Sequence, residues 1–195
     1  MNDAAIAEIP EAALAAADHV LGDARAELTL LEYGDYECPA CIRAEPLIRK
    51  LVDTHGGRMR LVFRHFPLME IHPNAELAAE AAEAAAAQGR FWPMHHLLFA
   101  QAHHLTPVAL AGYAHSLGLD MNRFNAEMAD RIYTQRVQEH RRAGERNGLR
   151  VTPTFFLNGQ SVDTSLGLEK LEDAVDVVLL ALGRQDGTTG GARAV

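Results

Sequence analysis

Two cysteines are the residues of this sequence best suited to chemistry. Cys38 and Cys41 stand three residues apart, and the 195-residue chain contains no other cysteine. Two thiols at this spacing can close a disulfide with each other and exchange it with another molecule. A structural disulfide framework would need more cysteines. Zinc would need about four ligands, and the histidine pair His95-His96 lies more than fifty residues beyond Cys41. We therefore expect redox chemistry and no metal at this pair.

The surrounding residues place Cys38 at the start of a helix. The apolar run 28–33 has the length of a buried strand, and the Gly-Asp pair after it signals a turn. Pro39 suits the first helical position, where its missing N–H costs nothing. A Cys38 thiolate there accepts unpaired N–H groups at the positive end of the helix dipole, which lowers its pKa. We expect Cys38 to be exposed and Cys41 to be half-buried, one turn on, where it can attack the same sulfur.

Two acidic residues, Asp35 and Glu37, precede the first cysteine. If they are charged and close to Cys38, they oppose formation of its thiolate. Charged residues in a loop are mostly solvated, so we interpret both as part of an exposed loop.

The residues after Cys41 continue as a helix and lead into a second strand. The helix ends at Gly56-Gly57 and contains Pro46, which removes a backbone hydrogen bond and kinks the axis. Residues 59–66 have a strand pattern. One helix between two strands makes a right-handed crossover, so the two strands should be parallel. The residues expected on the core face of the helix are Ile42, Ile48, Leu51 and Val52.

Residues 73 to about 147 carry helical patterns throughout. Thr106 and Asp120 suit helix N-caps, and Gly118 suits a helix stop. Because no strand pattern interrupts them, these residues predict a helical lid inserted into an α/β core.

The sheet is predicted to resume at residues 151–162, where Asn158-Gly159 between two β-rich runs indicates a hairpin. An amphipathic helix follows and is predicted to end at Gly183. The expected parts of the chain are an N-terminal arm (1–22), a core in two pieces (23–72 and 149–184), an inserted helical subdomain (73–148) and a disordered tail (185–195).

Composition excludes several classes of partner. The net charge is −8, and no basic stripe interleaved with aromatic residues is present, so nucleic acid is not expected as a partner. No apolar stretch is long enough to span a bilayer. The first twenty residues contain no Lys or Arg, whereas a secretory signal begins with positive charge. As written, the chain is predicted to be cytoplasmic; it would be periplasmic or secreted if a leader has been removed.

The histidines do not by themselves predict a metal site. His95-His96 and His103-His104 have no neighbouring carboxylate at ligand spacing in the sequence, so we expect no metal there. His65 follows the second strand, where it could influence Cys38, but a hydrogen-bonded structural histidine is the favoured interpretation. Residues 139–146 are charged and predict a solvated helix face with weak ion pairs.

Three motifs together resemble a known family. They are GDYECPAC at 34–41, FRHFPL at 63–68 and TPTFFLNG at 152–159, and Pro46 follows the second cysteine by five residues. In this order and spacing they resemble the thioredoxin superfamily, and within it a bacterial branch of DsbA-like thiol–disulfide oxidoreductases. The resemblance covers about residues 20–184. It implies an α/β thioredoxin-like fold with a helical insertion between the second and third core strands.

The resemblance also implies roles for individual residues. Cys38 would be the attacking cysteine and Cys41 the resolving one, with a redox-active Cys38–Cys41 disulfide. Pro153 would be a cis-proline beside that disulfide. Thr152 would offer its backbone to an extended substrate strand. With Pro39 and Ala40, these residues would form the substrate-binding surface.

Two positions depart from the family pattern. Strongly oxidising members have histidine where this chain has Ala40, and alanine offers the Cys38 thiolate neither a hydrogen bond nor positive charge. We therefore expect weaker oxidising power. Many relatives also have glycine at the position of Val151, whose side chain would narrow the peptide groove.

The predicted function is thiol–disulfide exchange by a protein-disulfide oxidoreductase. Its substrates would be protein thiols and disulfides or glutathione-type small thiols, and a partner redox protein would donate or accept the electrons. No cofactor is implied, neither metal nor flavin nor nucleotide. Two alternatives stay open: a disulfide isomerase, and a chaperone-like or adaptor binding module in which the CxxC pair is incidental.

Overall fold

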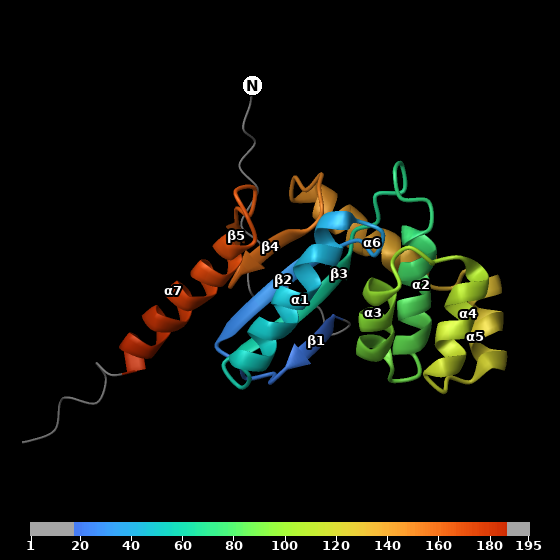
Figure 1. Cartoon of the computed structure of the whole chain (residues 1–195), viewed down its shortest axis with the longest axis horizontal. Coiled ribbons are helices and arrows are strands. Elements are labelled where there is room, and N and C mark those ends of the chain that lie inside the picture. Colours follow the sequence, from blue (N-terminus) through green and yellow to red (C-terminus); the bar gives the residue numbers. More distant parts are fainter. Residues whose placement is uncertain (1–17, 187–195) are drawn as a thin grey trace, which may run out of the picture.

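Within residues 18–186, which the computed structural model describes, the chain forms a five-stranded sheet with helices on both of its faces (Figure 1). The strands are β1 His19–Gly22, β2 Leu28–Gly34, β3 Met59–His65, β4 Thr154–Leu157 and β5 Gln160–Val162. The helices are α1 Pro39–Thr54, α2 Ala75–Ala86, α3 Phe91–Ala100, α4 Pro107–Ser116, α5 Met121–Ala129, α6 Thr134–Arg146 and α7 Glu169–Asp186. The strand order is β1-β3-β2-β4-β5.

Strand β2 is the centre of the sheet, and all of its residues are buried. It pairs in parallel with β3, with Leu30 opposite Leu61, and antiparallel with β4, with Leu30 opposite Leu157. The β2–α1–β3 unit is therefore the parallel crossover predicted from the sequence. Its geometry brings the end of β2 directly into the loop that carries Cys38.

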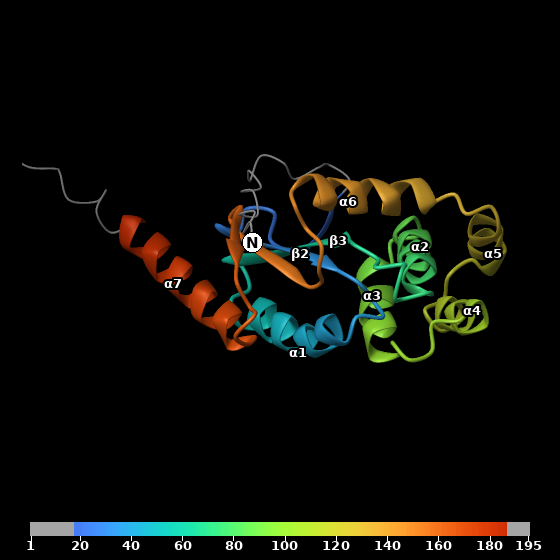
Figure 2. The same cartoon turned by 90° about the horizontal axis from the view of Figure 1, so that it is seen from above.

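Two apolar cores lie on opposite faces of the sheet. Helices α1 and α7 cover one face, and α6 crosses the other (Figure 2). The first core is formed by residues such as Ile48, Leu51, Leu171 and Val175. The second contains Leu31, Tyr33, Val62, Phe66, Leu149 and Phe156. Because the sheet is buried on both faces, the sequence of β2 is mostly apolar and does not alternate between apolar and polar residues.

Helices α2 to α6 are inserted between β3 and β4, and α2, α3, α4 and α5 gather beside the sheet (Figures 1 and 2). The predicted N-caps are present: the Thr106 hydroxyl accepts from Ala109 N, and the Asp120 carboxylate accepts from the first turn of α5. The alanines of α2 share an apolar cluster with Cys38 and Cys41. The insertion therefore contributes directly to the surroundings of the two thiols. The division of the chain at 72/73 and 148/149 stays a prediction.

Two predictions about the ends of the chain were wrong. Residues 19–22, expected in a loose arm, form β1, which pairs antiparallel with β3. A four-residue strand has little pattern of its own, and it forms because the edge of β3 offers unpaired backbone groups. Helix α7 continues past Gly183 to Asp186, because one glycine costs a helix only about 1 kcal/mol. Residues 1–17 and 187–195, the rest of the predicted arm and tail, lie outside the described residues.

One predicted core residue of α1 is also less buried than expected. Ile42 is half-buried and lines a cavity between α1 and α3. The remaining predicted positions, Ile48, Leu51 and Val52, are buried. The difference arises because the inserted helices leave an opening beside this turn of α1.

Candidate active site

Cys38 occupies the N-cap of α1, and Pro39 is its first residue. Cys41 lies in the first turn of the same helix, and both cysteines are free thiols in this structure. Cys38 is 6% exposed and Cys41 is fully buried. The expectation of an exposed and a half-buried thiol was therefore wrong. Both sulfurs are more enclosed because the inserted helices and Tyr36 pack against them in one apolar cluster.

The loop before β4 closes the site from the other side. The Cys38 thiol donates to the carbonyl oxygen of Thr152 at 3.3 Å. The Thr152–Pro153 peptide bond is cis, as the resemblance implied. A cavity of about 340 Å³ lies beside this bond. Ala40, Val151, Thr152 and Pro153 contribute to its lining. Of the four residues expected to bind substrate, Ala40, Thr152 and Pro153 line this cavity, and Pro39 is exposed at the start of α1.

The two thiols have opposite acidities. The pKa of Cys38 is lowered to about 5, chiefly by the hydrogen bond from Cys41. Burial opposes this shift, and the Thr152 side chain and the backbone N–H groups of Ala40 and Cys41 add to it. The pKa of Cys41 is raised well above its ordinary value, first by burial and then by its hydrogen bond to Cys38. Near neutral pH the pair therefore holds one thiolate and one thiol.

Glu32 is a residue of this site that the sequence analysis missed. It lies in β2 with its side chain fully buried, and neither carboxyl oxygen has a hydrogen-bond partner among the described residues. Burial raises its pKa, and the negative charges of Glu45 and Cys38 raise it further. The sequence did contain a signal for Glu32, because a charged residue in an otherwise apolar strand is either paired or functional.

The interpretation of Asp35 and Glu37 as a solvated loop was wrong. Asp35 is buried, and its carboxylate accepts from the backbone N–H of Leu68 and lies 2.8 Å from Nδ1 of His72. Glu37 accepts from the backbone and side chain of Asn74. Buried backbone N–H groups need acceptors. The two carboxylates supply them and fasten the loop before Cys38 to the loop after β3.

His65 and the charged residues 139–146, which the sequence also singled out, have structural contacts. His65 is buried, and its Nε2 lies 3.0 Å from Glu83. This contact matches the interpretation of His65 as a structural histidine. Within 139–146, Arg141 pairs with Glu145 and with Glu70, which gives the helix face the ion pairs that were predicted.

Comparison with known proteins decides the family. A sequence model described as thioredoxin matches residues 15–177. The chain belongs to the thioredoxin family. In this thioredoxin-family chain, no helix within residues 18–186 has the length and apolar character needed to cross a membrane.

Solved structures agree with this assignment. A thioredoxin-like oxidoreductase from Silicibacter pomeroyi is 27% identical, with a TM-score of 0.72, over 91% of this chain and 98% of its own. DsbA2 from Pseudomonas aeruginosa is 27% identical, with a TM-score of 0.65, over 83% of this chain and 94% of its own. BdbD from Bacillus subtilis, at 22% identity and a TM-score of 0.72, covers 82% and 91% and shares the fold. The predicted thioredoxin-like fold and the resemblance to DsbA-like proteins are confirmed.

Curated relatives match this thioredoxin-family chain over part of a longer protein. The protein named Na(+)/H(+) antiporter NhaA 1 of Salinispora arenicola is 47% identical over 158 residues, which are 81% of this chain and 24% of the relative. A second one, NhaA 3 of Salinispora tropica, is 45% identical over the same shares. The chain thus spans about a quarter of the length of the curated relatives it matches.

Proposed function

We propose that this thioredoxin-family domain exchanges disulfides with protein substrates through Cys38 and Cys41. The observation that carries the proposal is the placement of the two sulfurs, with Cys38 at the N-cap of α1 and Cys41 in its first turn. In this arrangement the pKa of Cys38 is lowered and that of Cys41 is raised. A thiolate is the nucleophile in disulfide exchange, and a nearby neutral thiol can resolve the product.

In the reducing direction the reaction has two steps. The Cys38 thiolate attacks one sulfur of a substrate disulfide, forms a mixed disulfide and expels the other substrate sulfur as a thiolate. Cys41 then loses its proton and attacks the Cys38 sulfur, which closes the Cys38–Cys41 disulfide and releases the second substrate sulfur. Two electrons pass from the cysteine pair to the substrate. The reverse sequence oxidises a substrate dithiol.

The first step prepares the second. The hydrogen bond to Cys38 and the charge of its thiolate both raise the pKa of Cys41. Once Cys38 carries a mixed disulfide, it no longer has that charge. The pKa of Cys41 then falls, and its thiolate forms where it is needed.

The substrate would bind along the loop before β4. Thr152 supplies backbone groups beside the Cys38 sulfur, and the cavity next to Pro153 is lined in part by Ala40 and Val151. An extended peptide can pair with such a backbone edge while its cysteine reaches Cys38. The side chain of Val151 lines the same cavity and is exposed.

The net direction depends on the compartment and on the partner. In the cytoplasm a partner redox protein or a glutathione-type thiol would keep the pair reduced, which favours reduction of substrates or redox sensing. In an exported protein the pair would be held oxidised, which favours oxidation or isomerisation. The side chain of Ala40 gives the thiolate no further donor, which argues for a cysteine couple less oxidising than one with histidine at this position.

Insulin reduction with dithiothreitol as electron source tests the proposal. We expect turnover by the wild-type protein and none by Cys38→Ser. Cys41→Ser should accumulate a mixed disulfide with substrate, because the resolving sulfur is absent. If Cys38→Ser retained full turnover, exchange through this pair would be excluded and the adaptor alternative would be favoured.

A further inference from the structure

A second cluster of reactive side chains lies one helical turn beyond the cysteines, between α1 and α3. Glu45 comes from α1, and His95 and His96 are neighbours on α3. His96 Nδ1 lies 2.8 Å from one Glu45 oxygen, and His95 Nε2 lies 3.5 Å from the other. One ligand atom from each of the three residues lies within 4.8 Å of the others. Sequence spacing did not predict this group, because 51 positions separate Glu45 from His96.

His95 is held in an arrangement typical of a metal ligand. Its ring is fully buried, and Nδ1 lies 3.0 Å from the Tyr36 hydroxyl. Nε2 faces Glu45 but has no hydrogen-bond partner among the described residues. A buried imidazole with one nitrogen fixed by a neighbour and the other unpaired resembles a histidine whose second contact orients it for a metal.

The types of donor in the cluster also suit a cation. A carboxylate and unprotonated imidazole nitrogens are the forms that bind a divalent metal, and binding releases any protons that they carry.

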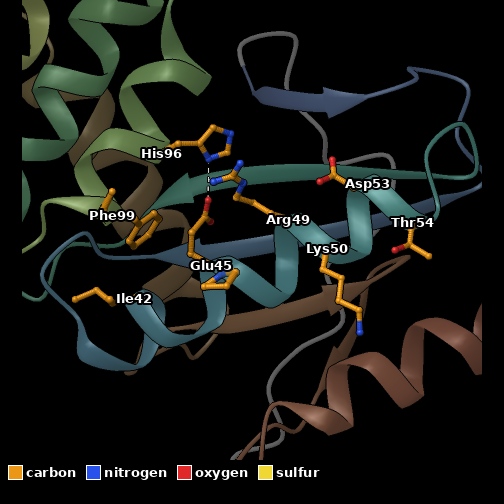
Figure 3. A pocket seen from close by; sticks show the side chains of 10 residues that line it. Ile42, Glu45, Arg49, Lys50, Asp53, Thr54, His96 and Phe99 are labelled. Atoms are coloured by element: carbon orange, nitrogen blue, oxygen red, sulfur yellow. Dashed lines mark hydrogen bonds and ion pairs between the residues drawn. The ribbon is translucent and has the colours of Figure 1, made fainter. Parts of the chain in front are cut away.

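The cluster is open on one side. Glu45 and His96 line a cavity of about 690 Å³ along α1, and Figure 3 shows their side chains pointing toward one another from the two helices. Arg49 lines the same cavity, and its exposed position lets solvent screen its charge. Water or a small ligand can thus reach the metal-facing side.

We propose that Glu45, His95 and His96 bind a divalent transition ion of the Zn²⁺ or Co²⁺ type. Two imidazoles and one carboxylate are a donor set suited to these ions, with a further position open to the cavity. The proton that His96 carries on Nδ1 when it donates to Glu45 moves to Nε2, so that Nδ1 can bind the ion. The ion would join α1 of the core to α3 of the insertion.

A second histidine–carboxylate cluster of this protein is not expected to bind a metal. His19, His65 and Glu83 also approach one another. There the guanidinium of Arg136 lies 2.7 Å from the Glu83 carboxylate. The positive charge of Arg136 already neutralises the Glu83 carboxylate. This second cluster can therefore serve as a control for the metal site at Glu45.

The test uses the full chain with the Cys38–Cys41 disulfide closed, so that the thiols cannot bind metal. Zn²⁺ is titrated calorimetrically, and Co²⁺ is followed by its visible absorption. We expect one tight equivalent, weakened at least tenfold by His95→Gln and by His96→Gln. The double variant His103→Gln/His104→Gln removes an exposed adjacent pair and should bind as the wild type does. Absence of a stoichiometric equivalent, or binding by the His95 and His96 variants equal to that of the wild type, would overturn the proposal.

Thermal unfolding gives an independent readout. An ion that binds the folded state alone raises its melting temperature. We expect Zn²⁺ to raise the melting temperature of the oxidised wild-type protein and of His19→Gln, and to leave that of His96→Gln unchanged. An equal rise in all three proteins would place the ion elsewhere and reject the site.

Discussion

The sulfur of Cys38 lies 3.3 Å from the carbonyl oxygen of Thr152, although 114 positions separate the two residues. The contact joins the start of α1 to the loop before β4. A substrate that reaches the sulfur therefore also meets the backbone beside Pro153. Burial in this enclosure opposes the Cys38 thiolate, and the hydrogen bond from Cys41 outweighs it.

The pKa of Cys38 should depend on the donor at position 41. The reduced wild-type protein should alkylate at Cys38 with a midpoint near pH 5, because Cys41 donates to the thiolate. Cys41→Ala removes the donor and should raise the midpoint, whereas Cys41→Ser keeps a hydroxyl and should raise it less. The rate of iodoacetamide labelling of Cys38 against pH, followed by mass spectrometry, gives the midpoint for each protein. Identical midpoints in the Cys41→Ala and Cys41→Ser proteins would contradict the assigned cause.

Stability of the reduced protein should rise with pH above 5. The folded pKa of Cys38 is about 5, and an unfolded cysteine has about 8.5. Between these values the unfolded state binds more protons, so the free energy of unfolding increases by up to about 1.4 kcal/mol per pH unit. This contribution is complete above the unfolded pKa and is lost as pH falls through 5. Urea denaturation of wild type and Cys38→Ala at pH 4, 6 and 8 checks it; a constant difference would refute it.

Ala40→His should make the cysteine couple more oxidising. An imidazole beside Cys38 adds a donor and positive charge, which favours the thiolate and so the reduced form. We expect the wild-type potential to lie between those of thioredoxin, about −270 mV, and DsbA, about −120 mV. The variant should move toward the second value. Equilibration with glutathione measures the potential, Ala40→Leu is the control without a donor, and a wild-type value as oxidising as DsbA would contradict the role of Ala40.

Glu32→Leu should stabilise the protein. The Glu32 carboxyl is buried and its pKa is raised chiefly by that burial, so the folded state holds a proton that the unfolded state releases above about pH 4.3. This difference in proton binding at Glu32 lowers the free energy of unfolding of the wild type as pH rises. Leucine cannot ionise and therefore removes the loss. We expect a gain of about 1–3 kcal/mol at pH 8 and a smaller one at pH 4. Urea denaturation with Glu32→Gln as control measures it; a destabilised leucine variant at pH 8 would show that the carboxyl is needed for folding.

Gly144→Ala and Gly112→Ala should have opposite effects on stability. A Cβ at Gly144 in α6 would lie 2.7 Å from the Phe66 ring, whereas a Cβ at Gly112 in α4 would meet nothing within 4 Å. Overpacking should cost Gly144→Ala about 1–3 kcal/mol. Gly112→Ala should gain about 0.5–1 kcal/mol from helix propensity. Chemical denaturation of both variants tests the packing of α6 on the sheet, and a neutral Gly144→Ala would show that the helix can shift away.

Several parts of the site could be predicted from local sequence. The position of Cys38 before Pro39 specifies a helix N-terminus, and the hairpin at Asn158-Gly159 needs a turn that these residues favour. Such features depend on hydrogen bonds and backbone preferences within about four residues. The sequence therefore contains their cause in one short window.

Long-range contacts were decided only by tertiary structure. Asp35 was expected in solvent, but packing places backbone N–H groups of another loop around its carboxylate. Glu45 meets His96 because α1 and α3 lie side by side. The short strand β1 forms because β3 presents an open edge.

The sequence by itself thus determined which two sulfurs can react and which end of a helix they occupy. Tertiary structure decided how deeply they are buried, which carboxylates lie near them and that Thr152 meets Cys38. The physical reason is that burial and charge–charge interactions depend on distances between segments remote in the chain, and only the packed fold sets those distances.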